Sequence, residues 1–264
     1  KSGNDGQGLV HVKTAYGVAL VRAKITDQVR RDEIFMPMHW NRQFASLARA
    51  GALTNPVVDR WSGQPELKHT PASITAWQPQ WFGKVLVAAG THEIDIPGFE
   101  YAAKTPQQHS VLFTLASKKA RPDLHDFAPF WQPASALIAD DVQTFHDDAT
   151  DTLRWAGFRD GRLLFVVMLA REEPNIDMQW LDQLFGKPQI DAGERRGVLS
   201  GKSPAGVEDC GRIVCACFSV GEKTLRKAIV TQKLTTPEQI GACLKAGTNC
   251  GSCIPELKSL LATP

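Results

Sequence analysis

The sequence lacks the features of membrane proteins and of nucleic-acid-binding proteins. No apolar run reaches the roughly 18 residues that a membrane-spanning helix needs, and the polar start Lys1–Gly6 does not form a signal peptide. An excess of one charge is also missing, because the net charge is +2 over 264 residues. We therefore predict no membrane and no nucleic-acid partner. The pattern G-x-G-x-x-G is absent, so we predict no flavin or NAD site of that kind.

Cysteine is scarce, with six residues in the chain, but four of them are grouped. Cys215 and Cys217 form one pair, and Cys250 and Cys253 form another about 30 residues later. Such spacings let two thiolates converge, and two such pairs suit zinc or an iron–sulfur cluster. Disulfides are the alternative, but an i, i+2 pair bridges internally only with severe strain. We predict a metal or cluster site and, without a secretion signal, a reducing cytoplasmic location.

Helix-start signals accompany both cysteine pairs. Ser219 and Glu222 have the S-x-x-E form of a capping box, which predicts a helix just past the first pair. Thr236, Pro237 and a Gln at the third helical position predict a second helix that ends near residue 246. A third helix is predicted at 254–261. Thiolates at helix N-termini are favoured by the helix dipole and by free backbone N–H groups.

For two further cysteines and three basic residues near the site, a structural interpretation is favoured over a functional one. Cys243 is predicted to be a small buried apolar residue, and Cys210 to have no functional role. Lys223, Arg226 and Lys227 either steer an acidic electron donor or form an ordinary solvated helix face, and the second interpretation is favoured.

The C-terminal stretch resembles a known family through these motifs. Cys-Ala-Cys, a helix-turn-helix of about thirty residues and Gly-Thr-Asn-Cys-Gly-Ser-Cys-Ile-Pro-Glu-Leu resemble the bacterioferritin-associated ferredoxin-like [2Fe–2S] domain over residues 212–262. That domain occurs alone and within assimilatory nitrite and nitrate reductases. The resemblance implies a [2Fe–2S] cluster on Cys215, Cys217, Cys250 and Cys253. Zinc stays open as an alternative, because sulfur ligation alone does not choose the metal.

The N-terminal segment has the alternation typical of β-structure. Apolar residues recur at alternate positions from Leu9 to Ile25, and Tyr16-Gly17 interrupts them, which predicts a β-hairpin. A further strand is predicted at 33–41, followed by a short helix at 44–48.

The order of motifs in this segment also resembles a family. The motifs are Val-Lys-Thr-Ala-Tyr-Gly-Val-Ala, Phe-Met-Pro-Met-His-Trp, Ala-Leu-Thr-Asn-Pro and Ser-Gly-Gln-Pro-Glu-Leu-Lys. They are similar to the final part of the molybdopterin-dinucleotide-binding barrel of bis-molybdopterin oxidoreductases, most closely assimilatory nitrate reductases. The resemblance implies that His39, Trp40, Asn41 and Asn55 contact molybdopterin guanine dinucleotide, whose phosphates need fixed donors. Gly51 departs from the family, which often has Asn there, and a His beside a Trp alone is more often packed structure.

The middle of the chain predicts a small α+β unit. Strands are expected at 81–89, 111–116, 140–148, 152–158 and 162–170, with a hairpin turn at Asp160-Gly161 and a helix at 178–185. About 40 residues are similar to the small α/β domain that follows the flavin and nicotinamide domains of pyridine-nucleotide reductases. The clusters at 92–95 and 146–148 lack metal-ligand spacing and are predicted to be solvated strand ends.

The predicted fold class is a multi-domain α+β protein with four segments. Residues 1–78 are the end of a molybdopterin dinucleotide-binding β-barrel domain, and residues 79–190 are the small α+β domain. Residues 191–211, rich in Gly, Arg, Ser and Pro, are a flexible linker. Residues 212–264 are a small all-α, helix-turn-helix [2Fe–2S] ferredoxin-like domain.

The two resemblances imply the electron-transfer part of an assimilatory nitrate reductase, at the C-terminal end of its catalytic subunit. Electrons would pass from a reductase subunit, a ferredoxin or a flavodoxin through the [2Fe–2S] cluster to an upstream molybdenum site that reduces nitrate to nitrite. The upstream molybdenum and [4Fe–4S] part is not in this chain, so we expect a piece of a longer protein that does not reduce nitrate alone. The alternatives are a four-cysteine docking module that holds zinc or a labile cluster, and the same domain in a nitrite reductase.

Overall fold

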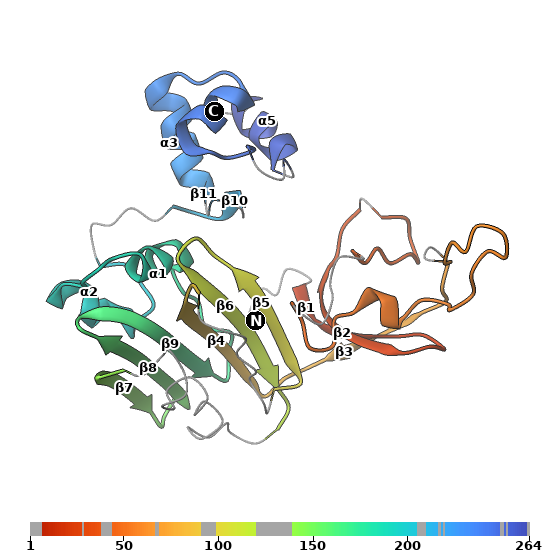
Figure 1. Cartoon of the computed structure of the whole chain (residues 1–264), viewed down its shortest axis with the longest axis horizontal. Coiled ribbons are helices and arrows are strands. Elements are labelled where there is room, and N and C mark those ends of the chain that lie inside the picture. The colour runs from red at the N-terminus through yellow and green to blue at the C-terminus, as the bar shows by residue number, and fades with distance from the viewer. Residues whose placement is uncertain are drawn as a thin grey trace.

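The computed structural model describes residues 7–27, 29–37, 44–66, 69–90, 99–119, 139–204, 210–215, 218, 220–248, 251 and 253–262. These residues form a three-stranded sheet, a six-stranded sheet with two helices, and a C-terminal group of three helices with two short strands (Figure 1). Every described strand pairing is antiparallel. The mixed α+β class is therefore confirmed. No helix among these residues is long and apolar enough to cross a membrane.

The N-terminal sheet contains the predicted hairpin. Its strands are β1 (Gln7–Lys13), β2 (Val18–Lys24) and β3 (Ser73–Trp77), in the order β2-β1-β3. The hydroxyl of Thr14 closes the turn by accepting from the backbone N–H groups of Tyr16 at 3.1 Å and Gly17 at 3.2 Å. Gly17 also lies against Ala52, where a Cβ would come within 2.3 Å of the carbonyl oxygen. Only glycine fits this turn without displacing the neighbouring chain.

The predicted helix at 44–48 is wrong. Ala45 instead bridges Ala103 of β5 (Tyr101–Pro106), and the N–H of Ser46 donates to the carbonyl of Ala102 at 2.9 Å. The edge strand β5 offers unpaired backbone groups, and satisfying them outweighs the helical pattern. A short 3-10 helix, η1 (Ala50–Ala52), follows.

The predicted strand at 33–41 is also wrong for residues 33–37, which form no regular element. Residues 38–41 lie outside the described residues. The three-stranded sheet is open among the described residues, so the β-barrel stays a prediction.

The large sheet has the strand order β5-β6-β4-β9-β8-β7. The remaining strands are β4 (Trp81–Ala88), β6 (Ser110–Ser117), β7 (Asp141–Asp147), β8 (Thr152–Arg159) and β9 (Arg162–Ala170). Asp160 and Gly161 make the predicted turn with φ angles of 51° and 77°. The central strand β9 is buried on both faces, which explains its continuous apolar run. The outermost strand, β7, is largely exposed.

Two helices cover one face of this sheet. Helix α1 (Met178–Phe185) packs with Leu86, Phe158 and Met168 in one apolar cluster. Helix α2 (Ala192–Val198) lies in the segment predicted as a flexible linker, so that prediction is wrong for 192–198. A capping box starts α2: the carboxylate of Asp191 accepts from the N–H of Glu194 at 2.9 Å. The domain boundaries themselves stay a prediction.

The two sheets share a core. Leu9, Leu20 and Trp77 of the small sheet pack with Tyr101 and Ala116 of the large one. A second link is charged, because the carboxylate of Glu173 lies 3.0 Å from Arg22 and 3.7 Å from Lys84. The N-terminal and middle units are therefore in direct contact.

The C-terminal group surrounds a separate apolar cluster. Its elements are β10 (Ile213–Cys215), β11 (Val220–Gly221), α3 (Glu222–Gln232), α4 (Pro237–Leu244) and α5 (Ile254–Ala262). The cap predicted for α4 is confirmed, since the hydroxyl of Thr236 accepts from the N–H of Gln239 at 3.3 Å with Pro237 at the helix start. The prediction of an all-α domain is wrong, because β10 and β11 pair. The group consists of helices and a small two-stranded ribbon.

Candidate cysteine site and pterin-domain surface

The structure brings together one cysteine from each predicted pair. Cys215 ends β10, and Cys253 directly precedes α5. Their side chains contact each other, and the two residues are only 2% and 6% exposed. Cys217 and Cys250 lie outside the described residues, and no group of three potential metal ligands occurs among the residues that are described.

The environment of Cys253 fits a thiolate ligand that needs a cation. Burial raises the pKa of the Cys253 thiol, and the neighbouring Cys215 raises it further. The backbone N–H of Gly247 acts in the opposite direction. A bound metal reverses the first two effects, because coordination deprotonates the thiol and neutralises the repulsion. Two buried sulfurs in contact therefore fit iron or zinc better than they fit two free thiolates.

The backbone before and after the first cysteine pair is held by close contacts. Residues Ile213 and Cys215 pair with β11, and the N–H of Lys223 donates to the carbonyl of Cys210 at 2.9 Å. At Gly221, a Cβ would lie 2.1 Å from that same carbonyl oxygen. Glycine at this position therefore lets the two segments approach.

The capping box predicted at Ser219 and Glu222 is wrong. Helix α3 begins at Glu222 itself, with Gly221 as its N-cap and no side-chain cap. Ser219 lies outside the described residues. The carboxylate of Glu222 instead accepts from the guanidinium of Arg226 at 2.9 Å. Of the three basic residues near the site, Arg226 is thus engaged within its own helix.

The two remaining cysteines differ from each other. Cys243 is exposed on α4, so the prediction of a buried residue is wrong. Cys210 is half-buried, and its carbonyl accepts from the N–H of Lys223 in α3. Neither residue lies in the contact between Cys215 and Cys253.

Only one of the four predicted pterin contacts can be placed. His39, Trp40 and Asn41 lie outside the described residues. Asn55 is half-buried, and its side-chain oxygen accepts from the N–H of Val57 at 3.2 Å. This bond closes a turn at Asn55-Pro56.

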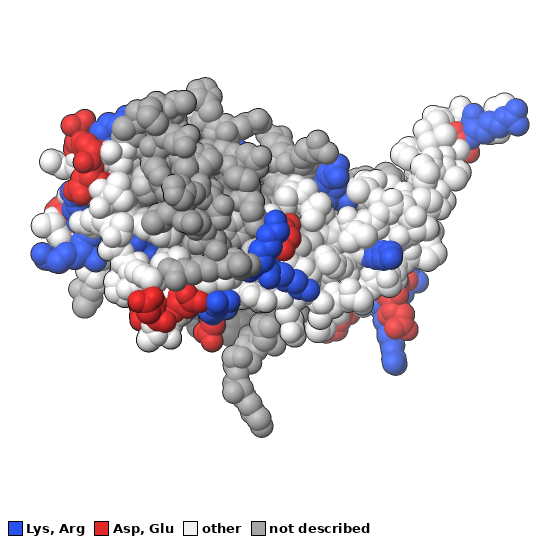
Figure 2. Space-filling model, turned by 90° about the horizontal axis from the view of Figure 1, so that it is seen from below, with Lys and Arg blue, Asp and Glu red and all other residues white. Residues whose placement is uncertain are grey.

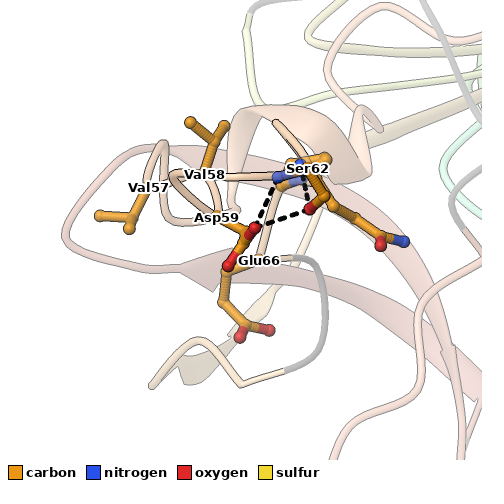
Figure 3. A pocket seen from close by; sticks show the side chains of 7 residues that line it. Val57, Val58, Asp59, Ser62 and Glu66 are labelled. Carbon is orange, nitrogen blue, oxygen red and sulfur yellow. Dashed lines mark hydrogen bonds between the residues drawn. The ribbon is translucent and has the colours of Figure 1, made fainter.

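The chain after Asn55 forms a polar loop around Asp59 (Figure 3). The Asp59 carboxylate accepts from the N–H of Ser62 at 2.7 Å, from its hydroxyl at 2.8 Å and from the N–H of Trp61 at 3.0 Å. The bond from the Ser62 N–H, with the other two, lowers the pKa of Asp59. The loop borders a pocket of about 640 Å³ whose lining includes Val57, Val58, Gln64, Pro65 and Glu66. The sequence predicts a turn at 53–56 and a loop at 62–68, but the hydrogen bonds to Asp59 were not predicted, although an Asp three residues before a Ser is a turn signal.

A larger groove lies against the small sheet. It has a volume of about 1010 Å³ and is lined by strands β1–β3 and by the segment 29–37. Several of its apolar side chains face solvent, with Ile25 79%, Phe35 75% and Ile74 51% exposed. On the face seen in Figure 2, the N-terminal part shows a broad surface with few charged side chains.

Comparison with protein families identifies two domains. Residues 213–263 match the BFD-like [2Fe-2S] binding domain, and residues 4–71 match the Molydopterin dinucleotide binding domain. The chain therefore combines an iron–sulfur domain with a pterin-binding domain, and both cofactors implied by the sequence are confirmed at the level of the domains that bind them.

The relatives that match most of the chain are nitrate reductase proteins. The chain is 36% identical over 258 residues to "Nitrate reductase" of Klebsiella oxytoca, which is 96% of this chain and 28% of that protein. It is 26% identical over 185 residues to "Assimilatory nitrate reductase electron transfer subunit" of Bacillus subtilis (66% of this chain, 21% of that protein). A match to "Nitrogen fixation protein NifU" of Leptolyngbya boryana is 37% over 54 residues (20% of this chain, 26% of that protein). No solved structure matches the chain.

These likenesses cover only part of each relative. The chain spans less than a third of the length of each of these relatives. The Bacillus likeness, at 185 residues, is longer than the C-terminal domain, so it includes part of the six-stranded sheet or of the N-terminal unit. The two domain matches and the Klebsiella likeness agree with the prediction of the C-terminal portion of a nitrate reductase that ends in a [2Fe–2S] domain.

Proposed function

We propose that this chain is the electron-transfer part of an assimilatory nitrate reductase. Cys215, Cys217, Cys250 and Cys253 would hold a [2Fe–2S] cluster, which supplies one-electron redox chemistry when bound. The observation that supports this most directly is the buried contact between Cys215 and Cys253 within the matched [2Fe-2S] domain. The residues of the chain hold the sulfurs, keep water away and leave acid–base chemistry to other parts of the enzyme.

The N-terminal unit would contribute to a molybdopterin guanine dinucleotide site. We assign His39, Trp40, Asn41 and Asn55 to this contact, with the family match over residues 4–71 in support. Because the oxygen of Asn55 accepts from Val57, its amide nitrogen is the donor that we assign to the cofactor. The molybdenum centre that reduces nitrate to nitrite would be supplied by the rest of the enzyme.

The partners follow from this arrangement. Most exposed large apolar side chains of the described residues lie before residue 78, and four of them line the apolar groove: Ile25, Ile34, Phe35 and Ile74. Such a surface is typical of an interface, and we assign it to the molybdenum and [4Fe–4S] part of the same enzyme. The electron donor would be a reductase subunit, a ferredoxin or a flavodoxin in the cytoplasm.

One measurement tests the cluster. Protein purified without oxygen is examined for visible absorption and for iron and zinc content. We expect iron and colour in the wild type, loss of both in Cys250→Ser, and no change in Cys243→Ser, because Cys243 is exposed on α4. Colourless, iron-free protein would overturn the proposal. Zinc without iron would establish the four-cysteine zinc module instead, which the buried sulfur pair also fits.

A further inference from the structure

A single arginine contacts the segments that carry both cysteine pairs. Arg212 lies three residues before Cys215, and its Nη2 atom donates to Glu222 at 3.3 Å and to Glu256. Glu222 is the first residue of α3, which follows the Cys217 segment, and Glu256 lies in the first turn of α5, directly after Cys253. The two carboxylates belong to different helices, and one guanidinium nitrogen reaches both.

We propose that Arg212 is a positioning residue that ties the two cysteine-bearing segments together and raises the reduction potential of the cluster; this inference rests on the proposed function. The chemistry suits the task, because Nη2 carries two N–H bonds and can direct one to each carboxylate. The guanidinium also keeps its charge at every working pH. Arg212 and Glu222 are joined a second time, since the N–H of Glu222 donates to the carbonyl of Arg212 at 2.8 Å.

Both carboxylates that Arg212 contacts are themselves held in place. Glu222 accepts from Arg226 at 2.9 Å, which holds its carboxylate against α3. In α5, the N–H of Leu257 donates to the carbonyl of Cys253 at 2.9 Å, so a displacement of this first turn moves the cysteine. A side chain that holds Glu256 in place therefore also holds Cys253 opposite Cys215.

The charge of Arg212 has a separate effect on electron transfer. Reduction would add one negative charge to a cluster held by Cys215 and Cys253, and the carboxylates of Glu222 and Glu256 belong to the helices that follow the two cysteine segments. The positive charge between these carboxylates lowers the electrostatic cost of that added electron. The Arg212 side chain is 60% exposed, so its ion pairs contribute little to global folding. Its removal is therefore expected to change the site without unfolding the chain.

The test uses the full chain, purified without oxygen, as wild type and as Arg212→Gln. Cluster loss is followed by visible absorption after addition of a chelator, and the midpoint potential by redox titration. We expect at least threefold faster loss in Arg212→Gln. We also expect a threefold shift in the reduction equilibrium, which lowers the potential by ~28 mV for a one-electron couple.

Matched variants separate positioning from general charge. Arg212→Lys retains the charge and enough N–H bonds for both carboxylates, so we expect values close to wild type. The exchange Arg212→Glu with Glu256→Arg restores the link to α5, and we expect it to slow the loss again. Lys258→Gln removes one exposed positive charge from α5 without touching the link, and we expect no change. If Arg212→Gln fails to fold, Glu256→Ala removes the acceptor that links Arg212 to α5, and faster cluster loss is again expected.

Two outcomes of these measurements would contradict the proposed role of Arg212. Wild-type values for Arg212→Gln, or an equal change in Lys258→Gln, would overturn it. A second readout needs no cluster: in cluster-free protein, alkylation of Cys253 is expected to be faster in Arg212→Gln than in wild type. This readout tests the link even if the wild type holds no iron, in which case the proposed function fails alone.

Discussion

The close approach at Gly221 provides the sharpest test of how the cysteine site is built. An alanine Cβ there would lie 2.1 Å from the carbonyl oxygen of Cys210, whereas a Cβ essentially never lies within 3.0 Å of such an atom. The segment before Cys215 must then move by roughly 1 Å. That movement breaks the bonds from Glu222 N–H to Arg212 at 2.8 Å and from Lys223 N–H to Cys210 at 2.9 Å.

The cost of this substitution can be bounded. Each lost backbone hydrogen bond costs about 1 kcal/mol, and overpacking costs about 1–3 kcal/mol. We therefore expect Gly221→Ala to destabilise the C-terminal domain by roughly 3–5 kcal/mol and to lower its iron content.

Urea unfolding and iron analysis of the full chain measure the two effects. Gly51→Ala is the control, because no atom lies within 4 Å of a Cβ at that position. If Gly221→Ala keeps wild-type iron and an unchanged unfolding midpoint, the close approach is not what shapes the site.

Two further predictions concern helix starts. Thr236→Ala removes the cap of α4, and we expect a loss of about 1 kcal/mol in urea unfolding; an unchanged midpoint would show that the cap is dispensable. The N–H of Glu194, followed by that of Gly193, lowers the pKa of Asp191 below its ordinary 3.8. A lowered carboxyl pKa means that the stabilisation of α2 is present above pH 3.8 and is lost as the pH falls through the folded value. Circular dichroism between pH 5 and 2 is expected to show this loss in the wild type and a smaller pH dependence in Asp191→Asn.

Local signals in the sequence predicted the elements that local chemistry controls. The Tyr16-Gly17 turn and the Thr236-Pro237 start are examples, because the hydrogen bonds that define them join residues within three positions. The cysteine site could be predicted for the same reason, because the spacing within each pair decides whether two sulfurs can converge.

Elements that depend on distant partners could not be predicted in this way. The apolar pattern at 44–48 favoured a helix, but the unpaired edge of β5 captured Ala45 through its bridge to Ala103. The start of α3 moved to Glu222 because Gly221 must approach Cys210. Helix α2 was overlooked in a stretch rich in Gly and Arg, although Asp191 and Glu194 are a recognisable capping box.

The contacts of Arg212 could not be predicted from the sequence either. Arg212 and Glu256 are 44 positions apart, and each is an ordinary surface charge in the sequence. Only the antiparallel pairing of β10 with β11 and the position of α5 bring them together.

The outer strands of the large sheet have a consequence for handling the protein. One rim, β5, is already occupied by residues 44–46, whereas the other, β7, is largely exposed among the described residues and carries Val142 and Phe145 on its surface. A second molecule that extended the sheet would meet a filled rim at β5 and an exposed, partly apolar rim at β7. Self-association at the high concentrations that crystallisation and redox titration require is therefore expected at the β7 rim and not at the β5 rim.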